Sequence, residues 1–259
     1  MADIEFLTKN LLNTTTQMTV NSGTNSVANL MARDETKQYS SFQFNNDLTT
    51  SSIQITFDNT TSVSRIALIG INAKSFRLFY NGDTSNALAL QGDTSSSVWS
   101  SNSETSLYLA FDSISATQID IEMTATQVAD SEKILSYFGI CDTKLDFTRF
   151  PDSKGYKALI DAQEIVHTLS DGGTRVNSLG EKFSLDLKLK AIPRAMRDSL
   201  RSIFMDKDDF IFSAFGTTTS YEGIFYPVVW IGNFAFYQYN SNNVNSGYDG
   251  AIKLREIPT

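Results

Sequence analysis

The stretch Ile53-Gln54-Ile55-Thr56-Phe57 decides the fold, because its apolar and polar residues alternate strictly. A period of two places the apolar side chains on one face of a β-strand and the polar ones on the other. Leu107–Phe111 and Ile119–Met123 repeat the pattern, and clusters of Ser, Thr, Asn and Gly separate such runs. We therefore expect the first part of the chain to be an antiparallel β-sandwich of short, half-buried strands.

Two further runs in this part are continuously apolar. They cover Ile66–Ile69 and Ile134–Ile140. Continuous apolar runs of this length are typical of central strands that are covered on both faces. The long Gly82–Ser106 segment around Trp99 leaves two possibilities open, an exposed contact arm or a hairpin that contains an undetected strand.

The prolines and the charges divide the chain near residue 146. All four prolines lie after residue 150, and Pro151 begins a polar stretch typical of a linker. Residues 1–145 hold 8 basic and 15 acidic residues, net -7, whereas residues 146–259 hold 13 and 14, net -1. We expect two domains with different roles.

The second domain mixes strands with one helix. Ala158–Leu169 and Phe183–Leu189 alternate like strands, and further strands begin at Phe210. Pro193 stands where the first position of a helix tolerates proline, and apolar residues follow at helical spacing. The pattern predicts a small β barrel or sandwich with one amphipathic helix at about residues 193–206. The whole chain is therefore predicted to be mainly β.

Composition excludes several classes of function. The 259 residues carry a net charge of -8, without the Lys and Arg excess that attracts nucleic acid or anionic lipid. With one cysteine, Cys141, the chain forms no internal disulfide and no Cys-rich metal cage. With one histidine, His167, most histidine-based catalysis is excluded as well.

The ends and the hydropathy indicate where the protein is made. Met1–Phe6 contains acidic residues where a signal peptide has basic ones. No apolar run approaches the roughly 18 residues of a membrane-spanning helix. We expect synthesis in the cytoplasm without a signal peptide and no insertion into a membrane.

Residues 10–142 resemble the coagulation-factor type discoidin domain, a jelly-roll sandwich of the galactose-binding-like class. The resemblance is carried by Val27–Leu30, Arg33–Ser41, Ile53–Asp58, Val63–Leu68, Lys74–Tyr80 and Thr117–Glu122. This chain has Tyr39 where the family has tryptophan, Ser51-Ser52 where it has an aromatic residue, and no cysteine pair. The resemblance implies the fold, and loops at one end of the sandwich that bind sugars, lipids or proteins, but it names no ligand.

The second domain is similar to C-terminal modules of tail proteins from tailed bacteriophages. The similarity rests on Val228–Phe236 and on the final strand Gly250–Glu256. A discoidin-like domain followed by such a module is similar to minor tail, distal tail or adaptor proteins. The resemblance implies a non-enzymatic structural component of the virion tail, in the tail tip or baseplate, that is made in the host cytoplasm. Its partners would be other tail proteins, a symmetric homo-oligomeric ring and a host-surface polysaccharide.

Two groups of residues are candidates for binding. Aromatic rings beside amides and carboxylates are used in sugar and protein recognition, and the ligand-binding candidates of this kind are Phe42, Phe44, Asn45, Asn46 and Asp47. Alternatively, Phe42 and Phe44 plug the end of the sandwich. The interface candidates are Phe225, Tyr226, Trp230, Phe234 and Phe236. So short a domain cannot easily bury all these rings, which favours a subunit interface. A pure core is the alternative.

Residues with reactive side chains are interpreted as structural. We expect His167 to be a partly buried structural or interface residue and Cys141 to be a small buried hydrophobe. Asp120 and Glu122 indicate a solvated strand face, and Asp206–Asp209 indicates a loop that ends a helix and lacks the glycine and glutamate of an EF-hand. Asp34 is a weak calcium candidate that rests on the discoidin resemblance.

No catalytic residue, metal or cofactor is predicted. Two alternatives to a structural tail protein remain. One is a carbohydrate-binding module for host recognition. The other is a polysaccharide-degrading enzyme, which needs two carboxylates about 5–10 Å apart in a cleft.

Overall fold

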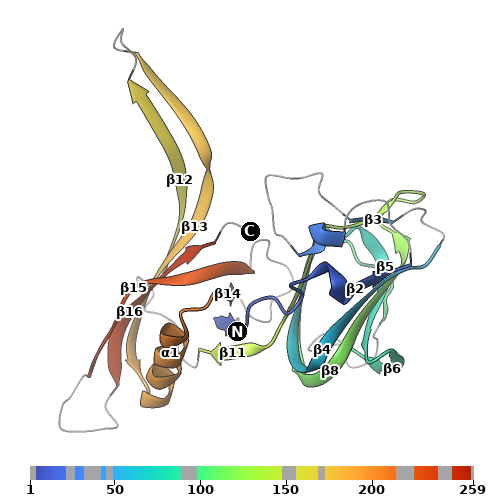
Figure 1. Ribbon diagram of the computed structural model, residues 1–259, viewed down its shortest axis with the longest axis horizontal. Helices are drawn as coiled ribbons and strands as arrows, with labels where there is room; N and C mark the ends of the chain where they lie inside the picture. The colour runs from blue at the N-terminus through green and yellow to red at the C-terminus, as the bar shows by residue number, and fades with distance from the viewer. Residues whose placement is uncertain are drawn as a thin grey trace. The chain divides into compact units, whose positions relative to one another are not determined.

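The structure is a computed structural model (Figure 1) that describes residues 4–21, 27–31, 42–44, 49–88, 98–147, 156–168, 173–213, 225–238 and 247–257. It divides into two compact units. Unit 1 comprises Met1–Lys144, Ser213–Phe225 and Thr259, and unit 2 comprises Leu145–Phe212 and Tyr226–Pro258. The segment Ser213–Phe225 therefore belongs with the first unit, which the simple division of the sequence near residue 146 did not foresee.

Unit 1 is built from antiparallel strands. Its main sheet has the order β10-β4-β8-β5-β6, with β2 beside β4 and β7 beside β5, and β3 pairs with β9 separately. The strands are β1 (Glu5–Leu7), β2 (Met18–Val20), β3 (Phe42–Phe44), β4 (Ser51–Ile69), β5 (Ala73–Tyr80), β6 (Asp83–Ala87), β7 (Val98–Trp99), β8 (Ser106–Thr126), β9 (Lys133–Leu135) and β10 (Tyr137–Cys141). β11 (Thr143–Asp146) follows at the division between the units.

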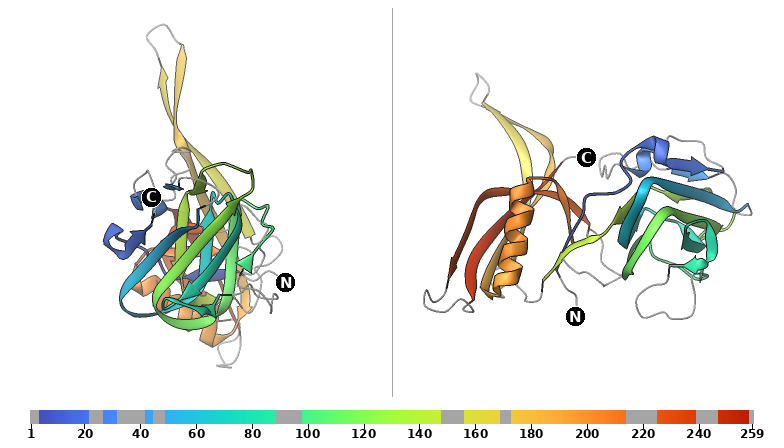
Figure 2. Two further views of the ribbon diagram at one scale, coloured as in Figure 1. Left: turned by 90° about the vertical axis from the view of Figure 1, so that its right-hand side faces the viewer. Right: turned by 60° about the horizontal axis from the view of Figure 1, so that its bottom comes forward.

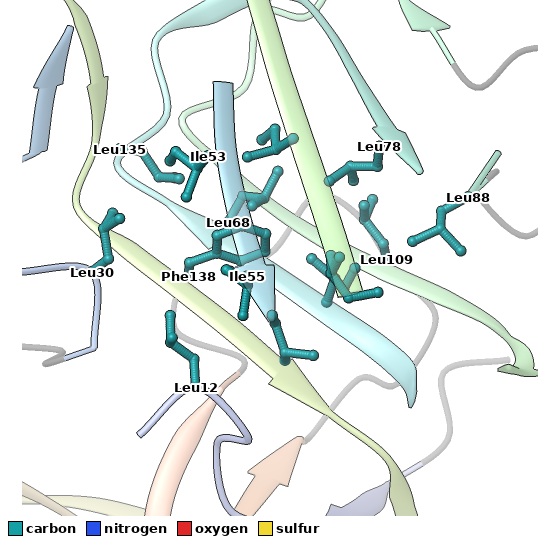
Figure 3. Packing of buried hydrophobic residues seen from close by; sticks show 14 of the residues in the cluster. Leu12, Leu30, Ile53, Ile55, Leu68, Leu78, Leu88, Leu109, Leu135 and Phe138 are labelled. Carbon is teal, nitrogen blue, oxygen red and sulfur yellow. The ribbon is translucent and has the colours of Figure 1, made fainter. Parts of the chain in front are cut away.

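The core of unit 1 follows from the alternation in β4 and β8. Ile53 lies opposite Ile121 in the sheet, Ile55 lies opposite Ile119, and all four are fully buried. Figure 3 shows side chains of β4, β5, β8 and β10 converging on one cluster. The predicted sandwich strands with one buried face are confirmed.

Two other expectations for unit 1 are also met. Every residue of β10 is buried, as the continuous apolar run predicted. The long Gly82–Ser106 segment contains β6 and β7, so it does include strands that alternation alone did not reveal. Trp99 stacks on Phe76 with 4.5 Å between ring centroids and packs against the core.

Unit 2 is an antiparallel sheet with a helix on it. The order is β14-β15-β16-β13-β12. The elements are β12 (Tyr156–Thr168), β13 (Thr174–Ile192), α1 (Arg194–Asp206), β14 (Phe210–Ser213), β15 (Tyr226–Gln238) and β16 (Tyr248–Glu256). Within the described ranges α1 is the one α-helix of the chain, so the mainly β fold with a single helix is confirmed.

Helix α1 shows its predicted amphipathic pattern. It buries Met196, Leu200 and Ile203, and Figure 2 shows it lying along the sheet of unit 2. Pro193 is the residue before the first helical position, with extended backbone, rather than the first helical residue. The helix ends at Asp206, and Lys207 directly after it has the left-handed conformation common at helix ends, with φ 52°.

Strands β12 and β13 continue beyond the rest of their sheet. They pair from Tyr156 opposite Leu187 to Thr168 opposite Thr174, but β16 pairs with β13 only from Ser184 to Ile192. Residues 160–168 and 174–183 therefore form a two-stranded projection, which we call the ribbon. Figure 1 shows it extending past β15 and β16.

Candidate functional site

The predicted ligand-binding loop is only partly described. Phe42–Phe44 forms β3, in which Phe42 lies opposite Leu135 and Phe44 opposite Lys133 of β9. The side chains of Phe42 and Phe44 lie outside the described part of the structure, and so do Asn45, Asn46 and Asp47. Their role in binding stays a prediction.

The structure buries Phe225 on the outer face of the main sheet of unit 1 instead of at an exposed interface. It is 1% exposed, and its ring contacts those of Tyr108 and Tyr137 at centroid distances of 6.2 and 6.1 Å. Gly139 leaves the space for it on the outer face of β10. The sequence pattern suggested that Phe225 belongs to the aromatic strand of the second domain. In the structure that strand, β15, begins at Tyr226, and Phe225 belongs to unit 1.

A buried ionic cluster lies on the outer face of the same sheet. The guanidinium of Arg65 binds both carboxylate oxygens of Glu5, with Nη2–Oε1 2.7 Å and Nε–Oε2 3.0 Å. The Tyr108 hydroxyl donates to Glu5 Oε2 at 2.8 Å. Burial, followed by the negative charge of Glu5, raises the pKa of Tyr108 well above its usual value. Sequence analysis missed this cluster. An arginine directly before the apolar run Ile66–Ile69 was a signal that a buried acidic partner exists.

This cluster fixes β1 to the main sheet of unit 1. Arg65 Nη1 also donates to the carbonyl oxygens of Ser64 and Phe111 at 2.8 and 3.3 Å, so the guanidinium is held on several sides. Glu5 and Arg65 are 2% and 7% exposed, which leaves no access for a substrate. A bidentate buried pair of this kind positions the chain and does not perform chemistry.

The remaining predicted interface residues lie on β15. Tyr226 stacks on Phe183, with ring centroids 4.1 Å apart. Trp230 and Phe234 pack against Phe204 of α1 at 5.4 and 5.7 Å, and Phe236 lies 4.8 Å from Phe234. All four of these candidates are half-buried. They form a helix–sheet cluster, and whether their exposed parts bind a partner stays a prediction.

The opposite face of the same sheet is open and carries an apolar hollow. Two cross-strand rows there are Lys188, Ala251 and Ala235, and Asp186, Lys253 and Ile231. Tyr237 of β15 lies opposite Asp249 of β16 on the same face. The hollow has a volume of about 520 Å³. Its lining includes the lysines 188, 190 and 253 together with Ile231, Ala235 and Tyr237. We call it the lysine-rimmed hollow.

A β-bulge shapes the hollow. The register of β15 against β16 shifts between Ile231 and Ala235, and Gly232 within the shift has φ +84°, a conformation that favours glycine. Ile231, Ala235 and Tyr237 share one face because an even number of positions separates them along the strand. Sequence analysis interpreted this aromatic strand as core or interface without separating its two faces.

His167 and Cys141 are placed differently from each other. His167 near the end of the ribbon is exposed, so the prediction that it is partly buried is wrong; the two-stranded ribbon has no third layer to cover it. Cys141 is fully buried, as predicted, and burial raises the pKa of its thiol well above the usual value. Its Sγ lies 3.8 Å from the carbonyl oxygen of Lys9.

The acidic pair on β8 is less solvated than the sequence indicated. Asp120 is 6% exposed and accepts hydrogen bonds from Gln118 Nε2 at 2.8 and 2.9 Å. Burial raises the pKa of Asp120, although these hydrogen bonds oppose the shift. Glu122 pairs with Arg77 across the strands, with 2.6 Å between Arg77 Nε and Glu122 Oε2. Of Asp120 and Glu122, only Glu122 is therefore partly solvated, as the sequence predicted for both.

In the described ranges no three His, Cys, Asp or Glu residues are grouped so that they could hold a metal ion. Asp34, the weak calcium candidate, lies outside those ranges. No helix in the described part of the chain is long and apolar enough to span a membrane.

Comparison with known proteins gives likenesses of fold only. No protein-family model and no curated protein sequence matches the chain. Chitosan-binding module 1 of a chitosanase/glucanase from Paenibacillus sp. IK-5 is similar at 12% identity and TM-score 0.42, covering 52% of this chain and 99% of the module.

Two further similar structures cover about the same share of the chain. A pectin-binding carbohydrate-binding module has 19% identity and TM-score 0.37, covering 51% of this chain and 91% of its own. The GH29 fucosidase of Ruminococcus gnavus in complex with fucose has 13% identity and TM-score 0.41, covering 52% of this chain and 26% of the enzyme. At these values the likeness assigns no ligand to this chain.

Proposed function

We propose that the protein is a non-catalytic structural component of a bacteriophage tail that assembles with neighbouring tail proteins and with copies of itself through unit 2. The ribbon is the observation that carries this proposal. Two-stranded ribbons are at best marginally stable in water without a third strand or a covering layer. A projection of this kind is best explained by a partner that covers it in the assembled state.

The base of the ribbon is firmly anchored, in contrast to its outer part. Phe183 is 8% exposed and stacks on Tyr226, and its backbone N–H donates to Glu256 Oε2 at 2.8 Å. Beyond this point neither strand has a second neighbour among the described strands. Nine residues of β12, from Ile160 to Thr168, span about 30 Å at roughly 3.4 Å per residue. Both edges of that length are available for strand addition.

A second open edge lies on β15. β14 pairs only with Tyr226–Val228, so among the described strands residues 229–238 of β15 pair with β16 alone. Long apolar edges invite pairing with another chain, and monomeric proteins usually protect them with charges, prolines or bulges. This edge has a bulge at Gly232, but its open face carries the apolar side chains of Ile231, Ala235 and Tyr237. It therefore supports assembly for the same reason as the ribbon.

The size of the full chain in solution tests the proposal. Light scattering over a wide concentration range, alone and with candidate tail proteins, should show a ring-sized or concentration-dependent assembly. Hydrogen exchange should show amides of residues 160–168 and 174–183 slowing on assembly, while amides of β4 and β8 remain unchanged. A chain that stays monomeric with every partner, or an assembly in which the ribbon remains unprotected, would contradict the proposal.

Carbohydrate binding by unit 1 is a second candidate. It is favoured by the sequence Phe42–Asp47, which places aromatic rings next to amides and a carboxylate. Affinity electrophoresis of the full chain in gels containing pectin, chitosan or a neutral glucan tests it, with Phe42→Ala and Phe44→Ala as variants. Because the chain has a net charge of -8, retardation by cationic chitosan must survive high salt to count as specific binding.

An enzymatic role finds less support in the open surfaces. Glycoside hydrolysis uses two carboxyl groups on either side of the scissile bond. The lysine-rimmed hollow is lined by one carboxylate, Asp249, whose Oδ1 accepts a hydrogen bond from the Ala191 N–H at 2.7 Å. We therefore propose binding without catalysis.

A further inference from the structure

A small acidic knob stands out on unit 1. Val128 is 71% exposed and is the only large apolar side chain of unit 1 that is exposed within the described ranges. Asp130 and Glu132, two and four residues further on, are exposed carboxylates. Glu104 is also exposed and lies beside the same turn, because Gln127 Nε2 donates to its carbonyl oxygen at 3.0 Å. Val128 and these three acids form the knob.

Hydrogen bonds hold the knob in one conformation. The hydroxyls of Thr126 and Ser131 both donate to the Val128 carbonyl oxygen at 2.6 Å. The Gln127 N–H donates to the Asn72 carbonyl oxygen at 2.8 Å. An exposed valine on an ordered turn loses little conformational entropy when it binds, so the turn is preorganised as an anchor.

The lysine-rimmed hollow on unit 2 has the complementary character. Its apolar floor includes Ile231 and Tyr237, which are 39% and 73% exposed. Its lining contains three lysines against the single carboxylate of Asp249. The hollow is thus a locally positive, apolar site on a chain that is acidic as a whole.

We propose that the knob of one copy of this chain binds in the lysine-rimmed hollow of a second copy. Val128 would contact Ile231 and Tyr237, and the acids around it would face Lys188, Lys190 and Lys253. This inference rests on the self-assembly in the proposed function and adds to it the two surfaces and their polarity.

The arrangement determines the type of assembly. In the proposed contact each copy uses its knob on one neighbour and its hollow on another, which makes the contact heterologous. Repetition of such a contact gives a closed ring or an open filament rather than a two-fold dimer. The charged rim steers association and excludes neutral partners, while the apolar anchor supplies affinity.

Two variants separate knob from hollow. In the knob variant, Val128→Asn is combined with Glu132→Gln; in the hollow variant, Lys188→Glu is combined with Lys253→Glu. All four positions are exposed, so each variant should keep the wild-type unfolding midpoint. The matched controls are Met205→Asn and Arg201→Glu, which change an exposed apolar residue and an exposed cation on α1.

Sedimentation velocity over a concentration series gives the result. We expect each variant to associate at least tenfold more weakly than the wild type and the controls to change less than twofold. A mixture of the two variants should form 1:1 dimers that do not grow, because only one functional knob and one functional hollow remain.

The outcomes separate this inference from the function on which it rests. If the wild type assembles and both variants assemble equally well, the knob–hollow contact is wrong and the proposed function stands. If the mixture forms long assemblies, the contact is not heterologous and the inference is again overturned. If the wild type never assembles, alone or with tail proteins, both proposals fall.

Discussion

The ring of Phe225 occupies the space that a side chain on Gly139 would need. A Cβ added to Gly139 would lie 2.6 Å from Phe225 Cε1 and 2.9 Å from a ring carbon of Tyr137. Both residues belong to unit 1, and they come together although 86 positions separate them in the sequence. Phe225 thus packs directly on the outer face of β10.

Enlarging Gly139 should destabilise unit 1. Gly139→Ala forces the two aromatic rings apart, and overpacking of this kind costs about 1–3 kcal/mol. Phe225→Ala leaves a cavity instead, at a cost of about 3–5 kcal/mol. Urea unfolding followed by tryptophan fluorescence measures both. The alanine at position 139 clashes with the Phe225 ring, which Phe225→Ala removes. The double variant should therefore lose less unfolding free energy than the sum of the losses in the two single variants.

The buried Glu5–Arg65 pair should contribute far more to stability than the half-exposed Arg77–Glu122 pair. Removing one partner of a buried pair typically costs about 3–5 kcal/mol, because the other charge stays buried. Removing one partner of a surface pair costs about 0–1 kcal/mol. Arg65→Gln and Arg77→Gln are the matched variants, compared by chemical denaturation. Equal losses would show that the Glu5–Arg65–Tyr108 cluster is more solvated than its geometry indicates.

Asp120 should make unit 1 less stable as the pH rises. Its pKa is raised in the folded state, so the folded chain holds this proton more tightly than the unfolded chain does. The stabilisation from the protonated form is present below the unfolded pKa, about 4, and is lost as pH rises through the folded pKa. Asp120→Asn should flatten the fall of the unfolding temperature with pH, as measured in thermal melts between pH 3 and 7.

Cys141 should be unreactive in the folded protein. It is fully buried and its thiol pKa is raised, so little thiolate is formed or accessible at neutral pH. We expect a chromogenic thiol reagent to react slowly in buffer and rapidly in denaturing urea. The rate in buffer should follow the stability of unit 1 and increase in the Phe225→Ala variant. Fast labelling of the native wild type would contradict this placement of Cys141.

Local sequence patterns predicted those parts of the fold that depend on neighbouring residues. The alternation at Ile53–Phe57 identified a strand with one buried face because a strand has a period of two. Likewise, the spacing of Met196, Leu200 and Ile203 identified the helix. Each of these patterns indicates only which face of a strand or helix is buried. Such a prediction is correct regardless of which other element packs on that face.

Contacts between distant residues could not be predicted in the same way. Arg65 meets Glu5 over 60 positions, and no local pattern specifies such a partner. The lysine-rimmed hollow depends on the register of three strands and on the bulge at Gly232. The sequence showed that the first domain is more acidic than the second. Only the fold showed that acidic side chains surround Val128 in the knob and that lysines including Lys188 surround the hollow.

Shortening the ribbon should abolish assembly with neighbouring tail proteins without unfolding unit 2. Ala162 and Glu181 lie directly opposite each other, so replacing residues 163–180 by Asn-Gly joins them with a two-residue turn that suits antiparallel strands. The anchored base at Phe183 is retained, and we expect an unchanged unfolding midpoint together with loss of the co-assembly with tail proteins seen by light scattering. In the matched control only residues 169–173 are replaced by Asn-Gly, which keeps the full ribbon and should keep assembly. If the shortened chain still assembles like the control, the ribbon is not the surface that binds the partner.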